Sequence, residues 1–448
     1  MKQIRAGKIM ALIAGIILIN CKHTPDPIDF VRVEGTKFFL GEEHYCYAGI
    51  NFWHGAYLGA DIISSGRERL VRELDLLKKY GINNLRIMAS SEKSPMLMSV
   101  YPVFQIKPGS YNEELLQGLD FLLNEMNARK MKAVMVMNNY WQWSGGMAQY
   151  VNWATGDSII DPDLSGNWHG FMIYSAGFYY NQKAKEYYLK YLNHVIRRKN
   201  TINHKYYFED PTIMSWELAN EPRPHPQSIQ DRKLLSEYYL WIDSAASYIH
   251  SLAPYQLVTT GSEGLAGSLH DSSIYFDSHS IRSIDYVTFH LWPKNWGWYK
   301  ADRKDETLPD VLAKSLVYCI RHFKYAELLN KPTVLEEFGI GRDYERIMPG
   351  TSVSVRDTFL NTIYRIIEQN MQDHGPVAGT NVWTWGGEGR SGKPGGEWIA
   401  DANYTGDPPQ EPQGLNSIFD TDTSTLNIIS RHSSIIRSIS GRYPKKTD

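Results

Sequence analysis

Two glutamates stand in short motifs whose residue types suit acid-base and nucleophilic chemistry. Glu221 lies in the segment Trp216–Arg223, and Glu337 lies in the segment Thr333–Gly339. Two carboxyl groups held about 5 to 5.5 Å apart can cleave a glycosidic bond with retention, because one protonates the leaving oxygen while the other attacks the anomeric carbon. The two segments therefore predict a catalytic carboxylate pair, provided that the fold brings them together.

Each segment contains a second acidic residue that competes for the same role. Glu217 lies four residues before Glu221, and Glu336 directly precedes Glu337. In a regular strand successive side chains point to opposite faces, so we expect Glu336 and Glu337 on opposite faces, with only one of them directed at a substrate. Periodicity alone does not choose between them.

The elements that must position these residues alternate along the chain. Apolar residues recur at helical spacing in four segments: Leu70, Leu74 and Leu77; Leu115, Leu119, Leu122 and Met126; Leu312, Leu316, Ile320 and Phe323; Leu360, Ile363, Ile367 and Met371. Between such helices lie eight strand-like runs: Tyr45–Asn51, Asn83–Met88, Lys132–Asn138, Thr212–Glu217, Leu257–Gly261, Tyr286–His290, Thr333–Glu337 and Gly379–Trp383. Such alternation predicts an α/β fold, a (β/α)8 TIM barrel that forms a single catalytic domain over residues 30–448. A small hairpin at Phe38–Leu40 is expected to close the barrel floor.

In a barrel of this kind the functional side chains lie at the C-terminal ends of the strands. Those ends carry carboxylates, amides, one arginine, one histidine and several tryptophans: Asn51, Trp53, Arg86, Asn138, Asn139, Trp141, Asn220, Glu221, His290, Trp292, Glu337, Trp383 and Trp385. Strand ends without a function would carry apolar or turn residues, so this set predicts a polar cleft.

The two glutamate motifs resemble those of glycoside hydrolase family 5. The Asn-Glu-Pro motif at Glu221 is similar to the family's acid/base motif, and the Glu-Phe-Gly motif at Glu337 is similar to its nucleophile motif. Arg86, His290 and Trp383 also fall on family positions, and the resemblance covers nearly the whole chain from about residue 30. It implies that Glu221 is the acid/base and Glu337 the nucleophile, both catalytic, of a retaining hydrolase.

Neighbouring residues are expected to tune this pair. Arg86 would favour the ionised nucleophile, whereas Glu221 should keep a raised pKa until the nucleophile has reacted. Asn220 would hydrogen-bond the 2-hydroxyl of the sugar, and His290 would contact the acid/base or the reacting sugar. Trp292 stands where much of the family has a tyrosine that holds the nucleophile, so another tyrosine could supply that bond.

The expected sugar follows from a further resemblance. The segment Val136–Gly146 departs from the histidine signature of the family's cellulases and resembles the Asn-Asn-aromatic pattern of its β-mannanases, as do Thr288–Trp296 and Gly379–Gly387. The chain is therefore expected to cleave β-1,4-mannosidic linkages in mannan, glucomannan, galactomannan or mannooligosaccharides by double displacement. Two alternatives remain: a cellulase or mixed-linkage β-glucanase on the same barrel, and a non-catalytic surface glycan-binding lipoprotein.

Tryptophan suits a sugar groove, because its rigid face packs on the C–H face of a pyranose while its N–H bonds a hydroxyl. Eight of the 13 tryptophans fall in rim segments: Trp53, Trp141, Trp143, Trp292, Trp296, Trp298, Trp383 and Trp385. Trp383 is predicted as the platform beneath the reacting sugar. The full set of predicted substrate-binding residues is Trp53, Arg86, Asn138, Trp141, Asn220, His290, Trp292 and Trp383.

Two long segments, residues 139–179 and 386–416, are expected to wall the cleft. If they close one end, sugars are released from chain ends, and otherwise the chain is cut internally; the sequence leaves both open. Asp420 and Asp422 are spaced as in a calcium loop, but the glycine and distal glutamate of an EF-hand are missing, so we expect an exposed turn and no metal.

Charge and composition argue against several other classes. The formal net charge is −2 with no block of like charge, which gives no support to nucleic-acid binding. The three cysteines, Cys21, Cys46 and Cys319, lack the paired spacing of a disulfide framework or a zinc site. We expect an uncharged partner, no cofactor and a monomer.

The first 21 residues predict an export signal. Three basic residues precede the apolar run Ile9–Ile19, which is too short to cross a bilayer as a helix. The following Leu-Ile-Asn-Cys resembles a bacterial lipobox ending at Cys21, with asparagine in place of the usual small residue. We expect a lipoprotein signal over residues 1–21, a tether over residues 22–29, and an extracytoplasmic protein that is lipid-anchored, or secreted if cleavage occurs elsewhere.

Overall fold

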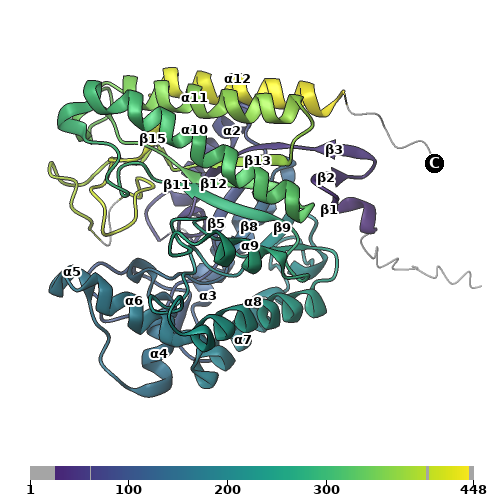
Figure 1. Cartoon of the computed structure of the whole chain (residues 1–448), viewed down its shortest axis with the longest axis vertical. Helices are drawn as coiled ribbons and strands as arrows, with labels where there is room; N and C mark the ends of the chain where they lie inside the picture. The colour runs from purple at the N-terminus through teal and green to yellow at the C-terminus, as the bar shows by residue number, and fades with distance from the viewer. Residues whose placement is uncertain (1–25, 61, 400–402, 443–448) are drawn as a thin grey trace, which may run out of the picture.

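Eight parallel strands form the centre of the computed structural model, which describes residues 26–60, 62–399 and 403–442. The predicted signal and Cys21 lie outside the described residues. In the order in which they pair, the strands are β10 (Leu257–Thr259), β9 (Ile213–Glu217), β8 (Lys132–Val136), β5 (Asn84–Met88), β4 (Tyr47–Asn51), β13 (Val377–Val382), β12 (Thr333–Phe338) and β11 (Val287–Leu291) (Figure 1). Each predicted strand is present, shifted by a few residues at most.

The two edge strands meet, so the sheet is nearly closed. The backbone N–H of Asp285 donates to the carbonyl of Val258 across 2.9 Å, and the hydroxyl of Thr259 donates to the carbonyl of Tyr286 across 3.0 Å. Together with the helices between the strands, this confirms the predicted single (β/α)8 barrel.

Helices surround the barrel, and several begin at a side-chain cap. Asn112, Asp231 and Asp271 accept backbone N–H groups at the first turns of α3 (Glu113–Ala128), α8 (Arg232–Leu252) and α9 (Ser272–Ser280). Side by side along one flank in Figure 1 lie α11 (Ser354–Gln372) and α12 (Thr423–Ser440). The others are α1 (Gly55–Gly59), α2 (Gly66–Lys79), α3 (Glu113–Ala128), α4 (Gly146–Thr155), α5 (Pro162–Ser165), α6 (Trp168–Ala176), α7 (Gln182–Ile196), α8 (Arg232–Leu252), α9 (Ser272–Ser280) and α10 (Lys304–Leu329).

The predicted apolar positions are buried in α2, α3 and α11 but only in part in α10. In α10 the buried residues are Val311, Ser315, Cys319, His322, Phe323 and Ala326, whereas Ile320 is 52% exposed. Of the four predicted positions, Phe323 is buried and Leu312 and Leu316 are partly buried.

A three-stranded antiparallel sheet covers the N-terminal ends of the barrel strands, where a hairpin was expected. It consists of β1 (Val31–Glu34), β2 (Lys37–Leu40) and β3 (Glu43–Tyr45). Phe38 lies at its centre, fully buried, and its ring meets Tyr286 edge-on at 5.3 Å. This small sheet therefore seals the barrel floor with aromatic packing.

Both long rim segments contain some regular structure. The first holds η2 (Gln142–Ser144), α4, α5, α6 and η3 (Gly177–Tyr179). The second follows β14 (Trp385–Gly387), which pairs with β15 (Ile418–Phe419) beyond the loop. Among the described helices, none combines the length and the apolar character required to cross a bilayer.

The remaining short elements lie between those already given. They are the hairpin strands β6 (Gln105–Lys107) and β7 (Ser110–Tyr111), and the turns η1 (Pro27–Asp29), η4 (Tyr207–Glu209), η5 (Ala301–Arg303) and η6 (Asp343–Glu345). The turn η1 falls inside the predicted tether.

Candidate active site

A β-bulge in β12 gives two adjacent glutamates a common direction. Phe289 pairs with Leu335, but the next residue of β11, His290, pairs with Glu337, so Glu336 is an extra residue. Asn51 donates its side-chain amide to the carbonyl of Glu336 across 3.0 Å. The expectation that the two side chains point to opposite faces is wrong, because a bulge breaks strand alternation and re-aims side chains.

Glu337 faces three donors at the top of the barrel. The guanidinium of Arg86 forms a short ion pair with it, and Nδ1 of His290 lies 3.3 Å from its Oε2. The indole N–H of Trp292 donates to the same oxygen across 3.2 Å. The hydrogen bond for which the sequence suggested another tyrosine is thus made by Trp292 itself.

Glu221 sits directly across from Glu337. Its backbone has φ of 50°, in the left-handed region that a β-carbon disfavours, and its N–H donates to the carbonyl of Gly261 across 2.9 Å. Its carboxylate lies 2.7 Å from Nδ1 of His290 and accepts the indole N–H of Trp141 across 2.6 Å. One carboxylate oxygen of Glu221, one carboxylate oxygen of Glu337 and a ring nitrogen of His290 all lie within 4.8 Å of one another.

Arg86 connects Glu337 to the polar residues beneath the cleft. It donates to Glu217 through Nε across 2.7 Å and through one terminal nitrogen across 2.5 Å, and to the side-chain oxygens of Asn51 and Asn220 across 3.0 and 2.8 Å. Asn220 also donates to Asn139 across 3.2 Å, which fixes its amide and leaves one N–H for the cleft. Glu217 therefore orients Arg86 from below and does not line the cleft.

Burial and hydrogen bonding act in opposite directions on the titratable groups. Burial disfavours charge on His290, but Glu337, Glu221 and Glu336 outweigh it and raise its pKa to about 10. Burial likewise opposes the charge on Glu221, but the bond and charge of His290 prevail and lower its pKa. The raised pKa expected for Glu221 is thus not found, because the hydrogen bond and the charge of His290 outweigh the effect of burial.

The pKa of Glu337 is raised by burial, against the opposing pull of His290 and Arg86. Below it, burial raises the pKa of Glu217 to about 8 despite the contact with Arg86. Glu221 and Glu337 thus have different surroundings, but their two pKa shifts run opposite to those expected for an acid and a nucleophile, because the closest bond of His290 is to Glu221.

A second ion pair supports Trp141 from outside. Arg223 pairs closely with Glu263, and its guanidinium lies 4.8 Å from the centre of the Trp141 ring. Glu263 also accepts the indole N–H of Trp296 across 2.8 Å. A series of contacts thus leads from Glu263 through Arg223 and Trp141 to the carboxylate of Glu221.

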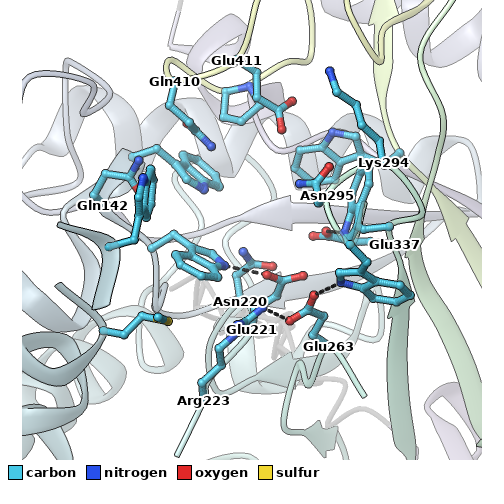
Figure 2. Close-up of a pocket in the computed structure, with 18 residues that line it drawn as sticks. Gln142, Asn220, Glu221, Arg223, Glu263, Lys294, Asn295, Glu337, Gln410 and Glu411 are labelled. Carbon is cyan, nitrogen blue, oxygen red and sulfur yellow. Dashed lines mark hydrogen bonds and ion pairs between the residues drawn. The ribbon is translucent and has the colours of Figure 1, made fainter. Parts of the chain in front are cut away.

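These residues line a cavity of about 630 Å³. Figure 2 shows Glu221 and Glu337 facing the same open space, with Gln410 and Glu411 projecting into it from one side and Arg223 and Glu263 from the other. The aromatic walls come from Trp141, Trp143, Trp168, Trp292, Trp296 and Trp383. Trp383 meets Trp292 edge-on at 5.9 Å, so the two rings form a corner beside the nucleophile.

Several predicted residues lie behind the cleft wall. Trp53 is 2% exposed, donates its N–H to the carbonyl of Gly406 across 2.6 Å, and reaches only a small recess below the cleft. Asn138 is fully buried and bonds the backbone of Asn139 and of Asn220. Trp385 is also fully buried and binds Glu73, and Trp298 packs behind Trp296.

Sequence reasoning missed part of the wall. Trp168 is 41% exposed at the cleft mouth and packs on Trp141, but it lies far from any strand end. Glu263 follows β10 at the fifth barrel rim position, so its place at a strand end was a usable signal. Gln410 and Glu411 lie within a loop whose course no local pattern reveals.

Three of these side chains lie close enough together to be considered as metal ligands. In the described part of the chain, Glu221, His290 and Glu337 are the one group close enough to hold an ion. A protonated His290 has no lone pair to offer, so these donors do not suit a metal. Asp420 and Asp422 are paired with Arg390 and Arg342, and Asp422 is 5% exposed, so the predicted exposed turn is instead a partly buried ion-pair site.

Known proteins resemble this chain over most of its length. Residues 28–440 match a family model described as GH family 5 beta-mannosidase-like. Mannan endo-1,4-beta-mannosidase 2 of Solanum lycopersicum is 30% identical over 369 residues, which cover 79% of this chain and 80% of that protein. The crystal structure of a glycoside hydrolase family 5 mannosidase from Rhizomucor miehei is 34% identical with a TM-score of 0.84 and covers 93% of this chain and 99% of its own. A mutant of that mannosidase, in complex with mannosyl-fructose, matches with the same identity and TM-score over 94% of this chain and 100% of its own.

Proposed function

Because this chain belongs to the glycoside hydrolase family 5 β-mannosidase-like family, we propose that it hydrolyses β-1,4-mannosidic linkages with retention. One observation carries the proposal: an oxygen of Glu221 and an oxygen of Glu337 lie within 4.8 Å of each other across the cleft. Retaining enzymes hold their carboxyl groups about 5 to 5.5 Å apart, whereas inverting enzymes need about 6.5 to 9.5 Å.

In the first step an oxygen of Glu337 bonds to the anomeric carbon while Glu221 gives a proton to the glycosidic oxygen, and the bond between that oxygen and carbon breaks. In the second step a water loses a proton to Glu221, its oxygen bonds to the anomeric carbon, and Glu337 leaves. Arg86 and Trp292 hold the nucleophile in place. The free N–H of Asn220 is available to the 2-hydroxyl, where a bond strengthens as the transition state forms.

The preference for mannosides is supported by the relatives rather than by the barrel alone. The Solanum lycopersicum relative carries mannan in its name, and a mutant of the Rhizomucor miehei mannosidase was crystallised in complex with mannosyl-fructose. A cellulase or mixed-linkage glucanase on the same barrel is the alternative.

Release of sugars from chain ends is the mode of action that the walls support best. The proton donor Glu221 marks the leaving-group side, together with Trp141 and Arg223, whereas Gln410 and Glu411 stand across the cleft from it (Figure 2). Asp407 holds this loop by accepting the N–H groups of Gly414 and Asn416, each across 2.8 Å. A fixed wall on the glycone side leaves room for few sugars there, so mannose is released from the non-reducing end.

The products formed from mannohexaose test this proposal. We expect mannose and mannopentaose first, with the new hemiacetal in the β configuration by proton NMR. Release of the α anomer would exclude retention, and mannobiose or mannotriose as first products would exclude end release. Faster cleavage of carboxymethyl cellulose than of mannan would favour the alternative substrate, and binding without reducing-sugar release would favour a glycan-binding protein.

Export with lipidation at Cys21 forms part of the same proposal. The basic residues, the apolar run Ile9–Ile19 and the Leu-Ile-Asn-Cys sequence support it. Labelling of expressing bacteria with radioactive palmitate should mark the wild-type chain but not Cys21→Ser, and equal labelling of both would contradict lipidation at this residue.

A further inference from the structure

A fully buried carboxylate lies below the cleft, and the mechanism above does not use it. Glu336 is 0% exposed, and neither of its side-chain oxygens accepts a hydrogen bond from any residue in the described ranges. The nearest cationic groups are Nε of Arg86 at 4.0 Å and Nε2 of His290 at 3.9 Å. An ionised carboxylate in such a place is costly unless a cation balances it.

His290 shows the complementary deficiency. Its Nδ1 lies at the oxygens of Glu221 and Glu337, but its buried Nε2 bonds to no described residue. An imidazolium carries a proton on both nitrogens, so Nε2–H would face Glu336 while Nδ1–H faces Glu221. A neutral ring carries a proton on only one nitrogen, so either Nδ1, which faces Glu221, or Nε2, which faces Glu336, would lack one.

The two arginines nearby do not balance all the carboxyl groups around His290. The titratable and charged groups that face His290 come from four strands and the turns after them: Arg86 of β5, Glu217 of β9, Glu221 and Arg223 after β9, Glu263 after β10, and Glu336 and Glu337 of β12. Arg223 binds Glu263, and Arg86 is shared between Glu217 and Glu337. Two guanidinium groups therefore face five carboxyl groups, and three of these, on Glu221, Glu336 and Glu337, lie beside the imidazole of His290.

We infer that Glu336 is a positioning residue that keeps His290 protonated, so that the proton for the leaving group is stored on His290 and reaches the substrate through Glu221. The β-bulge provides this arrangement, because it turns Glu336 inward beside the nucleophile. The catalytic part of this inference, the transfer of the proton to the leaving group, rests on the proposed function. The part that concerns the charge of His290 is independent of it.

The proton balance closes over one catalytic cycle. In the first step the Nδ1 proton passes to the Glu221 carboxylate, and the carboxyl group gives a proton to the departing oxygen, while the sugar carbon bonds to Glu337. His290 is left neutral and Glu221 ionised. In the second step the attacking water returns a proton to Glu221 and from there to His290, which restores the imidazolium.

Two variants separate charge from shape. Glu336→Gln keeps the size of the side chain and removes its charge, whereas Glu336→Asp keeps the charge. Histidine-selective ¹⁵N NMR of the full chain reports the ring state directly, with the signal assigned by its absence in His290→Asn. We expect His290 to remain an imidazolium through neutral pH in the wild type and in Glu336→Asp, and to lose its proton at least about one pH unit earlier in Glu336→Gln, which is a tenfold change in proton affinity.

Kinetics supply the second readout. Mannobiose has a leaving group that needs a proton. With this substrate, the alkaline limb of the pH profile of kcat/KM should move to lower pH in Glu336→Gln, by the same amount as the His290 titration. With 2,4-dinitrophenyl β-mannoside, whose leaving group departs unprotonated, the limb should stay in place. An unchanged His290 titration in Glu336→Gln, or equal losses on both substrates, would overturn the inference. If the wild type hydrolyses no β-mannoside, the proposed function fails, and the NMR titration still decides the charge state.

Discussion

The indole N–H of Trp292 donates to the carboxylate of Glu337 across 3.2 Å. An indole N–H is a donor only and does not titrate, whereas a phenol both donates and loses its proton near pH 10. The nucleophile therefore keeps this hydrogen bond at any pH at which the protein is folded.

Replacing Trp292 by phenylalanine should slow the chemical step. A hydrogen bond to a charged group contributes about 1.5 to 3 kcal/mol, which corresponds to a loss of about 10- to 150-fold in kcat, with KM changed less. Steady-state kinetics on mannobiose measures this. Trp298→Phe makes the same change behind the cleft and should retain activity, whereas a fully active Trp292→Phe enzyme would show that the bond is unimportant.

The roles of the two catalytic glutamates can be separated by azide. Both Glu337→Ala and Glu221→Ala should lose at least about 10⁴-fold in kcat/KM on mannobiose, because each removes one half of a double displacement. On 2,4-dinitrophenyl β-mannoside, Glu221→Ala should form an enzyme intermediate that azide converts to the β-azide. Glu337→Ala should yield only the α-azide, and the reverse pattern of products would exchange the two assignments.

Loosening the long loop should change the products. Asp407 is fully buried and accepts two backbone N–H groups and the hydroxyl of Ser417. Asp407→Ala leaves these donors unpaired, so we expect a lower Tm and more internal cleavage, seen as a faster fall in mannan viscosity per reducing end released. Asp373→Ala, an exposed change at the end of α11, is the control; an Asp407→Ala enzyme that still releases only mannose would contradict the proposed role of the wall.

Acid should destabilise the protein through His322. Its Nε2 accepts the N–H of Leu265 across 3.1 Å and its Nδ1 donates to the carbonyl of Tyr318 across 2.8 Å, so the folded ring is neutral. Burial lowers its pKa from 6.5 to about 3. Since the unfolded state binds the proton more tightly, the free energy of unfolding should fall as pH drops from 6.5 toward 3, by up to about 1.4 kcal/mol per pH unit for this group.

Urea unfolding at several pH values tests this dependence. His322→Gln should reduce the slope of unfolding free energy against pH, whereas the exposed His204→Gln should leave it unchanged. A slope that His322→Gln does not alter would assign the acid sensitivity to other groups.

The barrel was accessible to sequence reasoning because its signals are local. Strand runs and helical spacing are read within a few residues, and the carboxylates Glu221 and Glu337 sit in motifs next to strand ends. The inward turn of Glu336 was not accessible, because a bulge depends on pairing between β11 and β12 and on the amide that Asn51 supplies from another strand.

The positions of the rim tryptophans could likewise be predicted only in part. Trp53 follows a strand end, where functional residues of a barrel are expected. It is covered, however, by the loop that contains Gly406, which lies 353 residues later in the sequence and accepts the indole N–H of Trp53. Trp168 reaches the cleft through a helical excursion and carries no strand-end signal. Burial of a rim residue is decided by distant segments, which spacing does not encode.

The aromatic sheet at the barrel floor also sets an orientation. Its first strand, β1, begins at Val31, and the cluster around Phe38 packs on the N-terminal ends of the barrel strands, whereas Glu221 and Glu337 lie at the opposite ends. Anything attached to the chain ahead of Asp26 is therefore joined to the base of the molecule. A chain held at a surface by that end would turn the mouth of its cleft outward, toward polymers that approach from the surrounding medium.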